Sequence, residues 1–267
     1  MAADLRAPGA GATRWARVIE HNLAVYKRTW RSSIFFSFLH PLLFLLAMGL
    51  GLGSLIERTR PGGFGGFGYL AFLAPGVLAA ACMQTATFEF SFPTISKVTW
   101  YRNYEAMLAT PLSVRDIVAG ELGWGAVRLL SVAVPFYLIM VIFGLTSSPL
   151  SVLAIPAAVL TGLAFAGVLI GYSAPKDHYN DLTGMFRFVI TPLFLFSGTF
   201  FPVERLPEVL RPVAYATPLY QGVALVRGFA LGTLRPGPAL VHTSYLLVMA
   251  AGGAWFAHRK LRQKMET

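Results

Sequence analysis

The sequence predicts an all-α membrane protein with six transmembrane helices, and three observations support this fold class. Of the 267 residues, 55% are hydrophobic and only 13% are charged, and the mean hydropathy is +0.61. Such a chain has too few polar residues to cover the surface of a water-soluble globular protein of this size. The apolar residues also gather into long runs, and Lys and Arg gather between alternate runs, as in multi-pass membrane proteins.

Six apolar runs predict the membrane-spanning helices. A helix needs roughly 20 mostly apolar residues to cross a hydrocarbon core about 30 Å thick. The runs cover about residues 34–52, 69–90, 123–145, 150–172, 188–201 and 240–256. The fifth run is the shortest and contains Pro192, so a broken or partly re-entrant element stays open as an alternative there. The chain thus divides into a polar segment, 1–32, and a transmembrane domain, 33–267.

The distribution of basic residues predicts the orientation. Of the 22 Lys and Arg residues, 15 lie before the first run, after the sixth, or in loops that would face the same side. By the positive-inside rule both termini face the cytoplasm. The first 32 residues contain no apolar core, so we expect no removable signal peptide. Abundant Arg, Ala and Gly are typical of a high-GC bacterium, which indicates the bacterial plasma membrane, with the lipid bilayer and not nucleic acid as the partner of the positive charge.

An amphipathic helix is expected before the first span. Arg14–Trp30 carries Trp15, Ile19, Tyr26 and Trp30 among basic residues, a pattern that favours a helix lying in the cytoplasmic interface. A disordered basic tail is the alternative. Two tryptophans at helical spacing are costly to leave in water, which favours the helix.

The loop after the second span predicts a cytoplasmic surface element. Lys97–Leu108 reads as a helix with one aromatic and one charged side, and Pro111 stops it. Ser113 and Asp116 match a capping box that starts a second helix leading into the third span. After the fifth span, residues 201–235 are apolar but interrupted by four prolines, which predicts short helices dipping into the outer leaflet.

Three charges fall within or near the spans: Glu89, Glu121 and Arg128. An unpaired Arg in the middle of a membrane helix costs about 2.5–3.5 kcal/mol on insertion scales, so we expect a partner for Arg128. Either glutamate could neutralise it, and the group could be a structural pair or part of a transport path.

No catalytic or metal site is expected. The chain lacks the phosphate-binding loop of ATPases, and the glycine-rich stretch 62–66 has no lysine and reads as a linker. Ser173 and His242 would lie at opposite membrane faces, too far apart for a protease. A polar loop holds three residues that are more often solvated than metal-bound: Asp177, His178 and Asp181.

Several segments resemble one transporter family. Residues 104–113 (YEAMLATPLS) with 116–121 (DIVAGE) resemble the first cytoplasmic loop of ABC-2 type permeases. Similar matches follow at 71–76, 87–89, 160–166 and 190–202. Together they resemble the NodJ branch, the permeases of rhizobial nodulation-factor export.

The resemblance implies a six-span half-transporter that pairs with a second copy or a homologous permease. It also implies two copies of a separate P-loop ABC ATPase, which would hold ATP and Mg²⁺, while this chain binds no cofactor and is no enzyme. By this analogy the ATPase-coupling residues are Tyr104, Glu105, Met107, Leu108, Pro111 and Leu112. The outer gate would comprise Phe200, Phe201, Pro202, Tyr215 and Pro218.

The expected function is that of an exporter permease moving a lipid-linked glycan, a lipo-oligosaccharide or an amphipathic drug outward. An ion-gradient-driven secondary transporter or channel is the alternative. It would need acidic or histidine relays inside the spans, where Arg128 is the deepest charge.

Overall fold

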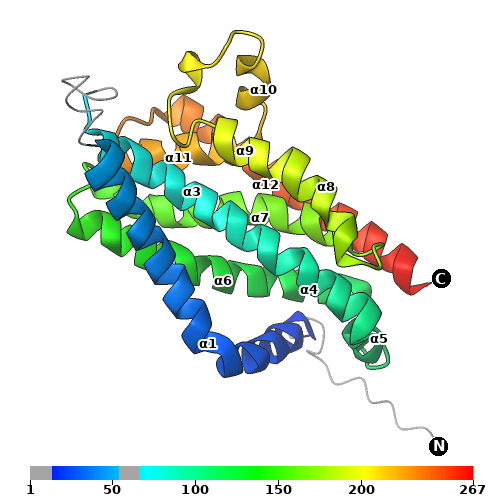
Figure 1. Cartoon of the computed structure of the whole chain (residues 1–267). Coiled ribbons are helices and arrows are strands. Elements are labelled where there is room, and N and C mark those ends of the chain that lie inside the picture. Colours follow the sequence, from blue (N-terminus) through cyan, green and yellow to red (C-terminus); the bar gives the residue numbers. More distant parts are fainter. Residues whose placement is uncertain (1–13, 54–65, 267) are drawn as a thin grey trace, which may run out of the picture.

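The computed structural model describes residues 14–53 and 66–266, apart from the side chains of residues 29–38, 40–41, 49–50 and 52. This part of the chain forms helices and turns, with no β-strand within it. Figure 1 shows the long helices running side by side as a bundle, which confirms the all-α class. Four of the described helices are long and apolar enough to cross a membrane: Tyr69–Trp100, Val114–Ile142, Pro149–Ser173 and Pro236–Met265.

The first helix, α1 (Arg14–Leu46), continues directly into the π-helical segment η1 (Ala47–Gly53). Figure 1 shows that α1 is bent, with its first part at an angle to the rest. The expected interfacial helix and first span are therefore one bent helix. Most side chains of 34–52 lie outside the described set, so the first span itself stays a prediction.

Helix α1 packs on α6 (Val114–Ile142) because α6 presents glycine to it. A Cβ atom on Gly120 would lie 2.5 Å from the Cβ of Val18 and 2.7 Å from the carbonyl oxygen of Trp15. Only glycine permits this approach of the two backbones. Val18 is buried in the contact, so the amphipathic part of α1 is held against the bundle.

The centre of the bundle consists of α3 (Tyr69–Phe90) and α7 (Ala154–Ser173). Both helices are apolar on all sides and bury most of their side chains, as expected of a helix surrounded by others. Helix α11 (Pro218–Leu231) packs on both of them. Helix α12 (Pro236–Met265) lies along α7 on the outside and buries little of its surface.

The predicted loop helix Lys97–Leu108 is wrong in one respect, because it is two pieces. The segments α4 (Phe92–Ile95) and η2 (Ser96–Trp100) continue the axis of α3. Arg102 then takes a left-handed backbone conformation (φ 48°), which ends that helix, and α5 (Asn103–Leu108) begins after it.

The predicted capping box is confirmed. Ser113 N donates to Asp116 Oδ2 at 2.9 Å, and Asp116 N donates to Ser113 Oγ at 3.3 Å. Helix α6 begins at once with Val114 and runs without a break to Ile142, three residues before the predicted end of the third span. The surface helix and the span are thus one rigid element.

The predicted fifth span, 188–201, is wrong at its end. Segments α8 (Thr183–Met185), η5 (Phe186–Ile190) and α9 (Thr191–Phe196) form one short helix, called helix 183–196 below. It stops at Phe196, because Ser197 Oγ donates back to the Leu193 carbonyl and Gly198 has a φ of +75°. It is not one of the four described helices long enough for a span.

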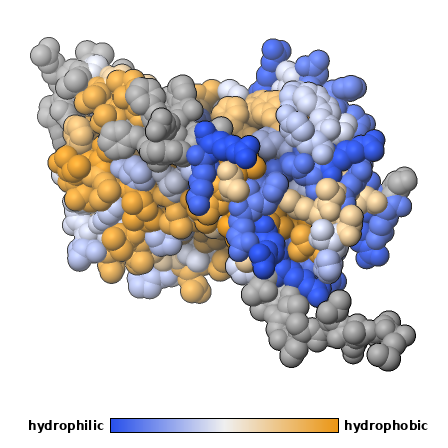
Figure 2. All heavy atoms as spheres, turned by 90° about the horizontal axis from the view of Figure 1, so that it is seen from below, coloured by the Kyte–Doolittle hydropathy of each residue, from blue (hydrophilic) through white to orange (hydrophobic). Residues whose placement is uncertain are grey.

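The bundle has two distinct ends. At the basic end lie α5, the 3₁₀ turn η4 (Tyr179–Leu182) and the last turns of α12 with their Lys and Arg residues. At the distal end lie η3 (Pro149–Leu153), η6 (Val203–Arg205), α10 (Arg211–Tyr215) and the end of α11. On the face drawn in Figure 2, hydrophilic residues gather at the basic end and hydrophobic residues cover most of the remainder. That division is typical of a bundle that sits in a bilayer and projects one end into water.

Candidate functional site

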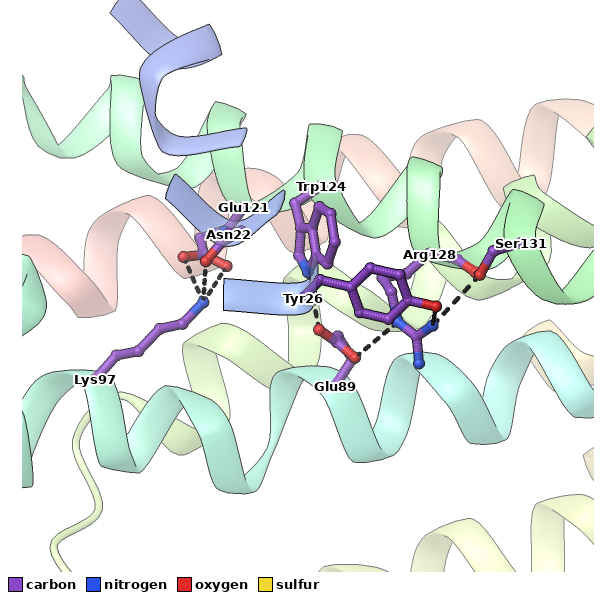
Figure 3. Close-up of polar contacts among 8 residues, drawn as sticks. All are labelled: Asn22, Tyr26, Glu89, Lys97, Glu121, Trp124, Arg128 and Ser131. Carbon is purple, nitrogen blue, oxygen red and sulfur yellow. Dashed lines mark hydrogen bonds and ion pairs between the residues drawn. The ribbon is translucent and has the colours of Figure 1, made fainter. Parts of the chain in front are cut away.

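A buried ion pair joins three elements at the basic end (Figure 3). The Lys97 ammonium of η2 donates to both carboxylate oxygens of Glu121 on α6, at 2.7 and 2.8 Å. It also donates to the Asn22 side-chain oxygen of α1 at 3.1 Å. The Glu121 side chain is only 3% exposed, and that of Lys97 is 18% exposed. Glu121 was one of two expected partners of Arg128, and the structure pairs it with Lys97 instead.

Helix α5 is anchored to this pair by Tyr104, whose side chain is fully buried. Burial and the neighbouring Glu121 carboxylate raise the pKa of the Tyr104 hydroxyl well above its ordinary value, so the hydroxyl stays protonated and can donate. Of the predicted coupling residues, Tyr104 therefore cannot meet a partner directly. It holds α5 in place.

The other predicted coupling residues lie on α5 or in the loop directly after it. Glu105 is exposed and lies 3.8 Å from Arg102, while Pro111 is fully at the surface. Met107, Leu108 and Leu112 are half-buried. Glu105 and Pro111 are thus open to a partner, and the other three residues are partly open.

A groove of about 240 Å³ lies between α5 and the amphipathic part of α1. Its lining includes two predicted residues and four that the sequence analysis missed; together they are His21, Asn103, Ala106, Met107, Thr110 and Leu112. The helical spacing of 103, 106 and 110 could have indicated a shared face. His21 comes from a segment too distant in sequence to be predicted.

A second polar group lies deeper along the same helices (Figure 3). Arg128 Nε donates to Glu89 Oε2 at 3.3 Å, and Trp124 Nε1 donates to Glu89 Oε1 at 2.8 Å. Arg128 Nη1 also donates to the Tyr26 hydroxyl at 3.1 Å, and the guanidinium lies 4.7 Å from the centre of that ring. The structure thus brings Glu89 and Arg128 together and adds α1 to the pair through Tyr26.

The predicted interfacial residues lie on α1 in different environments. Trp15 is 41% exposed, as an interfacial tryptophan would be, and Ile19 packs over Gly123 of α6. Tyr26 belongs to the Arg128 group. Its ring packs edge-on against the Trp124 ring, with the ring centres 5.5 Å apart. Trp30 is in α1, but its side chain is outside the described residues.

The predicted gate residues at the distal end divide between two clusters. Phe200 packs against Phe194 of α9, with ring centres 5.1 Å apart. Phe201 and Tyr215 instead pack on a small separate core under η6 and α10. Pro202 precedes η6, and Pro218 is the first residue of α11. The structure therefore does not gather all five into one constriction.

Arg227 was not among the charges singled out from the sequence. Arg227 lies in α11 and donates to three carbonyl oxygens: Phe72 at 3.0 Å, Gly198 at 2.9 Å and Thr199 at 3.3 Å. Its guanidinium also stacks over the Phe72 ring at 3.7 Å. Arg227 is the single charged residue in the apolar run 218–231, and this isolation could have predicted that it needs a partner inside the protein. This arginine fixes the turn that follows helix 183–196 and ties it to α3.

The remaining candidates do not assemble into a catalytic group. His242, near the start of α12, is hydrogen-bonded to Gln221 at the distal end, whereas Ser173 is the last residue of α7 toward the basic end. Asp177 accepts a hydrogen bond from Lys264 Nζ at 2.9 Å, and that bond lowers the pKa of the Asp177 carboxyl. These contacts are those of an ordinary polar surface.

Comparison with known proteins identifies the family. Residues 14–231 match the family described as ABC-2 type transporter. The chain is 34% identical to nodulation protein J of Rhizobium leguminosarum bv. trifolii over 225 residues, 84% of each chain. It is 32% identical to nodulation protein J of Sinorhizobium fredii over 242 residues, 90% of each. It is also 27% identical over 222 residues to the inner membrane transport permease YadH of Escherichia coli, covering 82% of this chain and 81% of YadH. The chain therefore belongs to the ABC-2 type transporter family and is a multi-pass membrane transport permease.

Proposed function

We propose that the chain is the membrane-spanning subunit of an ATP-driven exporter whose energy comes from a separate P-loop ATPase. Two permease chains and two ATPase chains would form the complex, with ATP and Mg²⁺ bound to the ATPase. Membership of the ABC-2 type family supports the transport role. The anchoring of α5 to the bundle through Tyr104 supports a role for this helix in transmitting motion from the ATPase.

The observation that carries the proposal is the way α5 is fixed. Glu105 of α5 and Pro111 in the loop after it are exposed, while Tyr104 reaches the Lys97–Glu121 pair inside. That pair belongs to η2 and α6, and Asn22 adds α1. A push on α5 would therefore move three long helices together, as a rigid-body mechanism needs.

The topology that fits this role has six crossings and both termini in the cytoplasm of a bacterial cell, with the basic end inside. The Lys and Arg residues near the end of α12 support this orientation. Helix 183–196 would be the short fifth crossing, and α10 with α11 would be the re-entrant pair at the outer surface.

The proposed cargo is an amphipathic molecule: a lipid-linked glycan, a lipo-oligosaccharide or a hydrophobic drug. The similarity to two nodulation J proteins favours a lipo-oligosaccharide, while YadH carries only the general name of transport permease.

Co-purification with the ATPase tests the coupling surface. Glu105→Arg and Ala106→Arg change exposed positions of α5, so we expect normal membrane insertion but loss of the ATPase from the purified complex. Glu266→Arg is the matched control, since it reverses a similarly exposed charge at the same end on α12. Retention of the ATPase by both α5 variants would refute the assignment. Transport by the purified chain alone, driven by an ion gradient, would favour the secondary-transporter alternative.

A further inference from the structure

An apolar cavity of about 530 Å³ lies between helix 183–196 and α7, with Pro218 of α11 and Met249 of α12 also in its lining. Apolar side chains line it from both sides, among them Phe165 and Leu169 of α7 and Met185 and Leu193 of helix 183–196. Its volume is in the range of ligand-binding pockets. The cavity therefore separates the short helix from α7 and is large enough for an apolar ligand.

The cavity runs along the helices. Its lining on helix 183–196 extends from Gly184 to Leu193, which corresponds to about 13 Å at the rise of an α-helix. It reaches Tyr172 near the end of α7, which is the end nearest the basic surface. This elongated, apolar space suits a hydrocarbon chain.

A cation lies at the end nearest the basic surface. Lys176 Nζ is 5.4 Å from the centre of the Tyr172 ring. Within the described residues Lys176 forms no ion pair, because the neighbouring Asp177 carboxylate is bonded to Lys264. An apolar channel with an uncompensated ammonium at its polar end is complementary to a molecule with an acyl chain and an anionic head.

We infer that this cavity binds one acyl chain of an anionic phospholipid from the adjacent leaflet, with its phosphate beside Lys176. Basic pockets between transmembrane helices recognise anionic lipid head groups by this charge complementarity. Helix 183–196 would then complete its packing on α7 through the lipid. The inference is independent of the proposed ATPase, since it concerns the chain in its membrane.

Gly184 offers a variant that fills the cavity. It lines the space, and a Cβ atom there would meet no heavy atom within 4 Å, so the position is open to a larger side chain at its first atom. Gly252 of α12 is equally open and is not part of the lining. Gly252→Leu is therefore the matched control for Gly184→Leu. Lys176→Gln removes the cation and keeps a polar side chain that is one atom shorter.

The experiment uses the full chain reconstituted in equal parts of phosphatidylcholine and phosphatidylglycerol, then extracted and analysed by native mass spectrometry. We expect the wild type and Gly252→Leu to retain a phosphatidylglycerol molecule. Gly184→Leu should lower retention of both lipids at least about tenfold, because excluding two methylenes from an apolar site has that effect. Lys176→Gln should lower the preference for phosphatidylglycerol about fivefold, the effect of one lysine near an anionic surface.

Equal retention by Gly184→Leu and Gly252→Leu would overturn the site. An unchanged preference for phosphatidylglycerol in Lys176→Gln would overturn the role of the anionic head. A thermal unfolding curve of each variant first establishes that the variant is folded. Its bound lipid is then measured. The ATPase is absent from every sample, so failure here would leave the coupling proposal standing.

Discussion

The buried pair of Lys97 and Glu121 predicts an asymmetric loss of stability. Lys97→Met leaves the Glu121 carboxylate, which is 3% exposed, without its cation. Glu121→Gln leaves the Lys97 ammonium with an amide oxygen to bind and with access to water, since its side chain is 18% exposed. We therefore expect the lysine variant to be the less stable of the two.

The magnitudes follow from burial. Breaking a buried ion pair costs about 3–5 kcal/mol, and the partial exposure of Lys97 places Lys97→Met near the lower value, about 3 kcal/mol. Glu121→Gln should cost about 1–2 kcal/mol, the loss of a charge-assisted hydrogen bond. At about 2–4 °C per kcal/mol for chains of this size, Lys97→Met should lower the melting temperature by roughly 6–12 °C.

Thermal unfolding of the detergent-purified chain, followed by size-exclusion chromatography, provides the measurement. Lys264→Met is the matched control, because its exposed pair with Asp177 should contribute little. The double variant Lys97→Met/Glu121→Gln should lose less stability than the sum of the two single variants, since it removes the uncompensated carboxylate. Equal losses in both single variants, or strict additivity in the double variant, would refute the reasoning.

Three further predictions concern other contacts. Arg128→Ala should lower the yield of folded protein in fluorescence-detected chromatography, and Glu89→Gln should partly restore it; independent effects would contradict the pair. Arg227→Lys should cost about 2 kcal/mol in thermal unfolding, because an ammonium cannot reproduce the planar set of bonds to three carbonyls, and a wild-type melting curve would contradict this. Gly167→Leu should cost about 1–3 kcal/mol by forcing α7 and α12 apart, whereas Gly252→Leu should leave the melting temperature unchanged.

The predicted elements were accurate where a local pattern was sufficient. The second span agrees with α3 at both ends, and the capping box at Ser113 starts α6 at the expected residue. Apolar run length and a three-residue cap are local properties of the chain. The fifth span failed at residue 197 because a side-chain bond and a left-handed glycine end the helix there, although the sequence stays apolar.

The candidate site was only partly predictable for a different reason. The sequence marked Glu89, Glu121 and Arg128 as charges that need partners, but it left open which pairs form. Lys97 appeared as one of several loop charges, yet it is the ion that neutralises Glu121. Arg227 lies within residues 201–235, and nothing local in that stretch showed that it would bond carbonyls of two other segments.

The sequence by itself determined that the chain is an all-helical membrane protein, where most of its helices run, and which end is basic, because burial in lipid demands long apolar helices with charges at their ends. The permease role came from the resemblance of its segments to the ABC-2 type family. Only the tertiary structure decided which charges pair, that Tyr104 faces inward, and that a cavity remains beside helix 183–196. Those features depend on how each helix is rotated and how closely its neighbours approach. Contacts between residues far apart in the sequence, such as that of Gly120 with Val18, set this rotation and spacing.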